Sequence, residues 1–350
     1  MKIGIPKEIT NNEYRVGMTP PGVKTLTQAG HSVFVELGAG VASGISNSEY
    51  IQAGALMVDK NEVWNCDVII KVKEPLESER PLIKEGQIIM AYLHLANIPD
   101  LETYLAKKGV TAIAYENVQT EDGTLPLLLP MSEVAGRLVV MQAATFLQKQ
   151  YGGSGQLLGG VNGVESGHVV IIGAGVAGRS AAKIAYGLGA RVTVLDTDLA
   201  KLRTIEELYN GHVETLFSNH SNIAKSVRFA DVVISAVLNA GEKSPIVVTE
   251  SMVKNMRPGS VIIDVAVDQG SSIETIDHTT TYDHPVFEKY GVLHYAVPNI
   301  PGATPYTSTY ALTNATFPYI LEICNLGLDK AIDKDPALAK GVVIYNGQIR

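Results

Sequence analysis

A glycine-rich turn is the feature of this 350-residue sequence that points most directly to chemistry. The apolar run 168–172 leads straight into Gly173, Gly175 and Gly178, and a helix-forming stretch then ends at Gly189. At this spacing the first glycine permits a tight turn, the second lets a pyrophosphate approach the backbone, and the third lets helix and strand pack closely. An ordinary strand–helix turn is the alternative, because glycine-rich turns are common. The position between strand and helix favours a dinucleotide-binding turn.

Asp196 indicates which dinucleotide this turn favours. It ends the next predicted strand, residues 191–196, where an acid can bind the hydroxyls of an adenine ribose. The 2′-phosphate of NADP would meet the negative charge of that carboxylate. The sequence therefore predicts NAD as the cofactor.

A second set of residues suits the binding and proton transfer of a small anion. Each member follows or ends a predicted strand, and in parallel sheets ligands bind beyond the carboxyl ends of the strands. Cations, an imidazole and carboxylates together fit an anionic substrate that exchanges protons. The set is Arg15, Lys71, Lys73, His94, Asp264 and Asp268.

Each of these residues also has an ordinary structural interpretation. A loop arginine is usually solvated, a histidine in an apolar run often lies in the core, and Asp268 can cap the turn that follows it. We expect Lys71 to be the solvated neighbour of Lys73. Convergence on one sheet edge favours the functional interpretation if the predicted fold is correct.

Two α/β units are predicted to position these residues. Residues 1–128, completed by 306–350, predict a substrate-binding domain with a mostly parallel sheet. Residues 129–305 predict an NAD-binding domain whose six strands match a complete doubly wound, Rossmann-like sheet. The fold class is thus α/β, with two such domains joined by two long helices and the first domain discontinuous.

The two long helices carry further expectations. Ser132 is predicted to cap the first, and Pro318 to interrupt the second, which covers residues 307–325. The glycine-rich stretch 151–164 is interpreted as a surface linker in preference to a mobile segment near the cleft. The second helix is apolar nearly all round, which predicts contact with a neighbouring subunit. Its apolar residues are Tyr310, Leu312, Phe317, Tyr319, Ile320 and Leu321.

Composition excludes several classes of protein. A formal net charge of −8 with scattered lysines and arginines argues against a nucleic-acid partner. No stretch approaches the roughly 20 apolar residues that span a bilayer, and the histidines lack metal-ligand spacing, so no metal is predicted. Cys66 and Cys324 are expected to be small core residues in a reducing compartment. These features predict a cytoplasmic enzyme that acts on small molecules.

Eight segments spread over nearly the whole chain resemble, in the same order, those of the bacterial alanine dehydrogenases, in the alanine dehydrogenase/pyridine nucleotide transhydrogenase family. They are GIPKEITNNEYRVGMTP, KVKEP, LHLA, MSEVAGR, GAGVAG, VAVDQG, TTTYDHP and TSTYALTNAT. The combination is far more specific than the glycine motif alone.

The resemblance implies a homohexamer that interconverts L-alanine with pyruvate and ammonia, using NAD. It assigns substrate binding to Arg15 and Lys73 and catalytic proton transfer to His94 and Asp268. The cofactor contacts that it implies, besides the three glycines, are Ser132, Asp196, Lys201, Ser218, Val237, Leu238, Val265, Asp268, Val297, Asn299 and Ile300.

Some positions depart from the family pattern, and two alternatives stay open. His278 and Thr279 stand where Arg-Pro is common, which puts one expected cofactor contact in doubt, and DQGSS replaces DQGG. Thr304 and Tyr306 stand where Val and a basic residue are common. The soluble NAD-binding subunit of transhydrogenase and a non-catalytic nucleotide-binding relative are the alternatives, since a fold does not fix a function.

Overall fold

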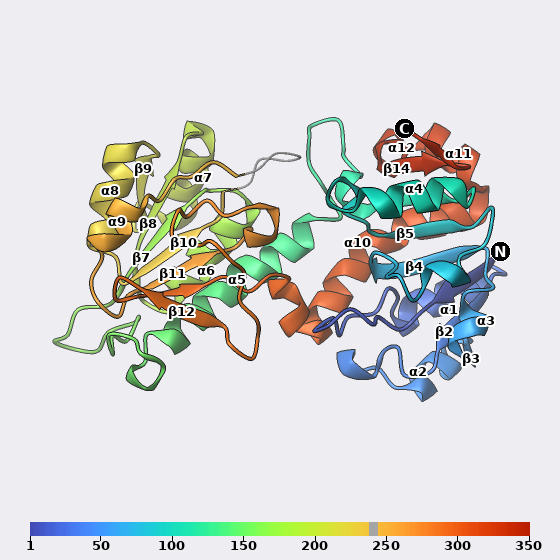
Figure 1. Cartoon of the computed structure of the whole chain (residues 1–350), viewed down its shortest axis with the longest axis horizontal. Helices are drawn as coiled ribbons and strands as arrows, with labels where there is room; N and C mark the ends of the chain where they lie inside the picture. Colours follow the sequence, from blue (N-terminus) through green and yellow to red (C-terminus); the bar gives the residue numbers. More distant parts are fainter. Residues whose placement is uncertain (238–243) are drawn as a thin grey trace. The chain divides into compact units, whose positions relative to one another are not determined.

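Short β-branched runs that alternate with helices fold this chain into two α/β units (Figure 1). The computed structural model describes residues 1–237 and 244–350. Unit 1 comprises Met1–Met131 and Gly302–Arg350, and unit 2 comprises Ser132–Pro301. The predicted fold class is confirmed, including the discontinuous first domain.

Unit 1 is built on an eight-stranded sheet with the strand order β15-β14-β6-β5-β4-β1-β2-β3. The six strands from β1 to β6 run parallel, and the hairpin of β14 and β15 joins β6 antiparallel. The strands are β1 (Lys2–Ile5), β2 (Ser32–Glu36), β3 (Leu56–Val58), β4 (Val68–Lys73), β5 (Ile88–Tyr92), β6 (Thr111–Ala114), β14 (Val342–Tyr345) and β15 (Gln348–Ile349). The carboxyl ends of β1, β4, β5 and β6 therefore share one edge.

Helices cover both faces of this sheet because successive residues of each strand point to opposite sides. One core contains Ile3, Ile70 and Met90 of the strands, with apolar residues of the helices α1, α2 and α10–α12. The other contains Ile69 and Ile89, with residues of α3 and α4. These helices are α1 (Pro20–Gln28), α2 (Asn47–Gln52), α3 (Lys60–Val63), α4 (Pro99–Lys107), α10 (Pro305–Leu326), α11 (Leu328–Lys334) and α12 (Pro336–Gly341).

Unit 2 has a seven-stranded sheet with the order β12-β13-β11-β10-β7-β8-β9. All neighbouring strands are parallel except β12, which pairs antiparallel with β13. The strands are β7 (His168–Ile172), β8 (Arg191–Asp196), β9 (Glu214–Phe217), β10 (Val232–Ser235), β11 (Val261–Asp264), β12 (Val286–Lys289) and β13 (Val292–Tyr295). The chain order reverses between β7 and β10, the switch point at which doubly wound sheets bind dinucleotides.

Two apolar layers enclose this second sheet. Val169 and Ile171 face a core shared with α5, α6 and α7, whereas Val170 and Ile172 face one shared with α8 and α9. These helices are α5 (Leu129–Phe146), α6 (Val176–Gly187), α7 (Leu199–Tyr209), α8 (His220–Arg228) and α9 (Glu250–Lys254). Both faces of the sheet are therefore buried, and its loops are left as the exposed parts that could contact a ligand.

Several sequence predictions about the elements are wrong. Helix α5 begins at Leu129, so Ser132 lies inside the helix and is not its cap. Pro318 does not interrupt α10, which runs unbroken from Pro305 to Leu326. A proline removes one helical hydrogen bond, and here buried residues on both sides, such as Thr316 and Ile320, fix the helix against the core. The edge strands β3, β12 and β15, and β14 beside β15, were not predicted, because such short strands carry little periodicity.

Helix α10 is also better covered than its composition suggested. Leu312 and Ile320 are buried, and the other four apolar residues cited above are half-buried against the unit 1 core. Three strongly exposed apolar side chains gather in the loop 151–164, where Leu157, Val161 and Val164 are each about 60% exposed, as are the more scattered Val41, Leu208 and Tyr306. That loop lies within unit 2, after α5.

Candidate active site

The glycine turn of unit 2 has the geometry that a phosphate requires. Gly173 has φ +102°, and a Cβ there would lie 2.6 Å from the carbonyl oxygen of Ala236. A Cβ on Gly178 would overlap the carbonyl oxygen of Gly173, whereas one on Gly175 would have no atom within 4 Å. Gly175 is also the N-cap of the twelve-residue helix α6. The open space at the start of α6 therefore fits a phosphate bound by backbone N–H groups.

Asp196 lies beside this turn. Its Oδ2 accepts a hydrogen bond from the Ala174 N–H at 2.6 Å, and its Oδ1 accepts one from the Asp198 N–H at 2.8 Å. The Ser218 N–H donates to the backbone oxygen of Asp196 at 2.9 Å. Lys201 is exposed on α7, with its Nζ 3.9 Å from Asp198 Oδ2. The structure thus places Asp196 and Ser218 next to the glycine turn.

The other predicted cofactor residues follow the carboxyl ends of β10, β11 and β13. Val265 donates its N–H to the Ser235 oxygen at 2.9 Å. Val297 and Ile300 are 1% and 2% exposed, so their side chains belong to the core and leave the backbone for contact with a ligand. Asn299 between them has φ +54°.

Val237, Ser132 and Leu238 are the other residues that were predicted to contact the cofactor. Val237 directly follows β10 and is half-buried, and its oxygen accepts a bond from Ser244 Oγ at 3.3 Å. Ser132 is half-buried on α5. Leu238 lies outside the described residues.

The two aspartates after β11 have different environments. Asp264 is fully buried, and its carboxylate accepts hydrogen bonds from the Ala266 and Ser272 N–H groups and from the hydroxyls of Ser271 and Ser272, at 2.8–3.1 Å. Asp268 is exposed in the turn Val267–Gln269. Asp264 therefore fixes the loop, and Asp268 is the solvent-exposed carboxylate of the two.

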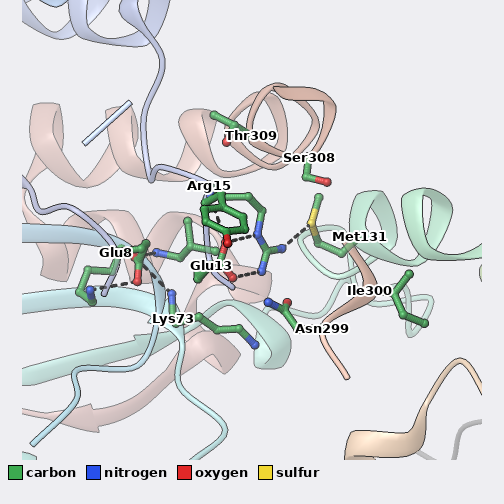
Figure 2. Close-up of polar contacts among 12 residues, drawn as sticks. Glu8, Glu13, Arg15, Lys73, Met131, Asn299, Ile300, Ser308 and Thr309 are labelled. Atoms are coloured by element: carbon green, nitrogen blue, oxygen red, sulfur yellow. Dashed lines mark hydrogen bonds and ion pairs between the residues drawn. The ribbon is translucent and has the colours of Figure 1, made fainter. Parts of the chain in front are cut away.

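In unit 1, Arg15 is only 3% exposed and is bound by Glu13. Its Nε donates to Glu13 Oε1 at 2.7 Å and its Nη2 to Glu13 Oε2 at 2.5 Å, while Nη1 contacts the sulfur of Met131 at 3.0 Å (Figure 2). Burial lowers the pKa of Arg15, but the bonds and charge of Glu13 outweigh it and raise the pKa overall. The Val16 N–H donates to Thr309 Oγ1 at 3.2 Å, which fixes the loop against α10.

The two lysines at the end of β4 have different environments, and that of Lys71 differs from the sequence prediction. Lys71 is 1% exposed, and its Nζ lies 3.1 Å from both Glu8 Oε2 and Glu79 Oε1. The prediction of a solvated Lys71 is therefore wrong, because two buried carboxylates hold its ammonium. Lys73 is half-buried, and no carboxylate in the described part of the chain lies within 4 Å of its Nζ. Its positive charge is therefore not neutralised by an ion pair among the described residues.

Glu8 connects this buried ion pair to Lys73. Its Oε1 accepts hydrogen bonds from the Val72 N–H at 2.6 Å and the Lys73 N–H at 3.4 Å (Figure 2). The pairing of β4 with β5 shifts register between Ile70 and Lys73, so the sheet alone does not fix this end of the strand. The Glu8 carboxylate supplies the hydrogen-bond acceptor for these two N–H groups.

His94 lies two residues after the end of β5 and is close enough to Lys73 and Arg15 to feel their positive charges. Its backbone has φ +47° and ψ +37°, and its ring stacks on Tyr92 with 6.2 Å between centroids. Burial, reinforced by the positive charges of Lys73 and Arg15, lowers the pKa of His94 to about 4. The imidazole is therefore neutral at neutral pH, the form that has a free lone pair.

Sequence reasoning missed three carboxylates that surround the candidate residues of unit 1. Glu13 binds Arg15, Glu8 binds Lys71, and Glu116 accepts hydrogen bonds from the backbone of His94. Glu116 could have been found from its position just after the strand 111–114, because that strand pairs with the strand that ends before His94. Glu8 and Glu13 lie in the loop after β1, where the sequence gives no sign of their pairing.

The described residues contain neither a candidate metal site nor a helix that could cross a membrane. Within residues 1–237 and 244–350, no cluster of three His, Cys, Asp or Glu side chains has the arrangement of a metal site. No helix in that part of the chain is long and apolar enough to cross a membrane. Cys66 and Cys324 are buried and unpaired with each other, as expected.

Comparison with known proteins gives matches over the whole chain. The model of the alanine dehydrogenase/PNT N-terminal domain matches residues 4–135, and that of the C-terminal domain matches residues 139–350. The alanine dehydrogenase of Methanococcus maripaludis is 54% identical, over 100% of this chain and 94% of that protein. The alanine dehydrogenase of Bacillus subtilis is 53% identical, over 100% of this chain and 92% of the other.

Solved structures agree with these matches. One titled L-alanine dehydrogenase superposes with a TM-score of 0.97 at 48% identity, covering 100% of this chain and 96% of that one. A transhydrogenase from Sinorhizobium meliloti superposes with a TM-score of 0.85 at 25% identity, covering 100% and 98%.

Proposed function

The chain belongs to the alanine dehydrogenase/PNT family, and on that premise we propose that it catalyses the reversible oxidation of L-alanine to pyruvate and ammonia with NAD. In balanced form, alanine, NAD⁺ and water give pyruvate, ammonium, NADH and a proton. The observation that carries the proposal is the group of Arg15, Lys73 and His94 beyond the carboxyl ends of neighbouring parallel strands in a family member. Two cations for a carboxylate beside a neutral imidazole suit an amino acid better than a second nucleotide.

The cofactor is a nicotinamide dinucleotide, and we assign it to unit 2. The open position at Gly175 and the start of α6 would hold the pyrophosphate, and Asp196 the adenine ribose. A carboxylate there favours NAD over NADP. When bound, NAD supplies the acceptor for the hydride that leaves the alanine Cα.

Unit 1 is proposed to bind the amino acid. The Arg15–Glu13 pair is neutral as a whole, so Lys73 contributes the net charge that attracts the substrate carboxylate, and Arg15 contributes directional hydrogen bonds. Holding the carboxylate at two points fixes where the Cα–H bond points.

Proton transfer is assigned to His94 and Asp268. Alanine loses a proton from its ammonium and a hydride from its Cα, which leaves a protonated imine, and a water molecule must then add to the imine carbon. Neutral His94 can take the proton from that water, and Asp268 can orient the ammonium or the water. The resulting carbinolamine then collapses to pyruvate and ammonia.

A kinetic experiment tests this function. The purified chain is mixed with L-alanine and NAD, and NADH is followed by its absorbance, with other amino acids and NADP in parallel. Lys73→Ala should raise the KM for alanine about 10–100-fold, since a lost hydrogen bond between charged groups costs about 1.5–3 kcal/mol. It should leave NADH binding nearly unchanged. Lys24→Ala, at an exposed position of α1, is the matched control.

The same experiment separates the alternatives. A transhydrogenase subunit would exchange hydride between nucleotides without alanine, and a non-catalytic relative would bind nucleotide without turnover. Absence of NADH formation with alanine refutes the proposal. Equal loss of NADH affinity in Lys73→Ala would make this lysine a structural residue.

We also propose that the chain assembles as a homohexamer, as the family resemblance implies. Because α10 is largely covered within the chain, the exposed apolar residues Leu157, Val161 and Val164 are the better candidates for an interface. Light scattering at micromolar concentration tests this, and a monomeric mass would exclude it.

A further inference from the structure

Glu116 lies at the carboxyl end of the strand next to the one that leads to His94. Strands β5 and β6 are parallel neighbours, and Glu116 is in the short 3₁₀ turn Tyr115–Asn117 that follows β6. Its Oε1 accepts hydrogen bonds from the N–H groups of His94 at 2.6 Å and Leu93 at 3.1 Å. Its carboxylate is largely buried, and burial raises the pKa of Glu116 against the lowering effect of these hydrogen bonds and of Lys73.

These bonds hold a backbone conformation that His94 does not prefer. The residue has φ +47°, in the left-handed region that L residues other than Asn and Asp rarely adopt. Strained positions of this kind persist where surrounding contacts fix them and occur often at functional sites. Glu116 provides that contact by accepting two consecutive N–H groups at the turn.

Glu116 also approaches the His94 side chain. Its Oε1 lies 3.8 Å from His94 Nδ1, an ion-pair distance that is too long for a hydrogen bond. The other ionisable groups facing the imidazole are Tyr92, stacked on it, and the cations Lys73 and Arg15. In the described part of the chain, Glu116 is thus the carboxylate that lies at ion-pair distance from the His94 ring, ready to pair with it when it is protonated.

We propose that Glu116 is the positioning residue of His94: it fixes the strained turn and favours the tautomer with the proton on Nδ1, which leaves the Nε2 lone pair for the reaction. The negative charge also stabilises the imidazolium that forms when Nε2 accepts a proton from water. A carboxylate behind a catalytic imidazole acts in this way in other enzymes. The inference rests on the proposed catalytic role of His94.

Glu116→Gln tests the charge separately from the backbone contacts. The amide oxygen can still accept from Leu93 and His94, but the negative charge is gone. We expect kcat to fall about 10–100-fold, the effect of losing such an outer partner, with NADH affinity unchanged. The limb of the pH profile that depends on His94 should move to lower pH, because a nearby carboxylate favours the protonated imidazole. Glu116→Asp keeps the charge and should leave that limb in place.

Asp67→Asn is the matched control. Asp67 Oδ2 accepts the Lys2 N–H at 2.7 Å in the same unit, at the opposite end of the strands. This variant should keep wild-type kcat and pH profile. Turnover is divided by the amount of NADH bound and is measured below the melting range of the least stable variant. Only folded sites are then counted.

The outcomes separate the inference from the function. If the wild type forms no NADH with alanine, the proposed function fails and the inference fails with it. If the wild type is active and His94→Ala is inactive, but Glu116→Gln turns over as fast as the wild type, the inference about Glu116 is overturned and the proposed function stands. A loss of turnover with an unmoved pH limb also overturns it, because a purely structural role would give that result.

Discussion

Replacement of Lys71 by methionine should destabilise unit 1 strongly, although the residue looks like a surface lysine in the sequence. Its ammonium is 3.1 Å from one oxygen each of Glu8 and Glu79, and all three side chains are at most 1% exposed. Each contact is worth about 5 kcal/mol at an effective dielectric constant of about 20, before the cost of burial. Lys71→Met leaves two buried carboxylates without their cation.

Loss of one partner from a buried ion pair costs about 3–5 kcal/mol. For a unit of this size that corresponds to a melting temperature lower by about 6–20 °C. Glu8 also accepts the Val72 and Lys73 N–H groups, so its displacement should raise the KM for alanine more than it weakens NADH binding.

Calorimetry of the wild type, Lys71→Met and Lys73→Met provides the measurement. Lys73 is the matched control, because it lies two residues away on the same strand and is only half-buried. A third variant, with Glu8→Gln and Glu79→Gln added to Lys71→Met, removes the uncompensated charges and should recover much of the stability. If Lys71→Met melts no lower than Lys73→Met, the ion-pair reasoning is refuted.

Three other predictions follow from the structure. Gly175→Ala should fold normally but bind NADH about 10–100-fold more weakly, which an NADH titration would show. Gly178→Ala should lower the free energy of unfolding by about 1–3 kcal/mol through overpacking, which a melting experiment would show. Asp196→Ala should narrow the preference for NAD over NADP, measured as the ratio of kcat/KM; a wild type that uses both equally would contradict this assignment. Burial lowers the pKa of His294 from its ordinary 6.5 to about 4. The unfolded chain therefore binds the proton first, and His294 should lower stability by about 3 kcal/mol as the pH falls from 6.5 to 4; a His294→Gln variant with the same pH dependence would refute this.

Much of unit 2 was predictable because its signals are local. A buried strand, three glycines at fixed spacing and an acid at the end of the next strand lie within residues 168–196, and each acts on its neighbours in the chain. The carboxyl-end position of Arg15, Lys73 and His94 also follows from strand order in a parallel sheet. The roles of these side chains stay predictions that the experiments above test.

The sequence alone determined which residues end strands, but tertiary structure decided which of them are free to act. Lys71 and Lys73 are equivalent by strand alternation, and only the folding of the loop after β1 onto β4 brings Glu8 to Lys71. The left-handed turn at His94 likewise depends on Glu116, 22 residues further along the chain. Pairings of buried charges depend on contacts between segments distant in the sequence, and no local spacing encodes them.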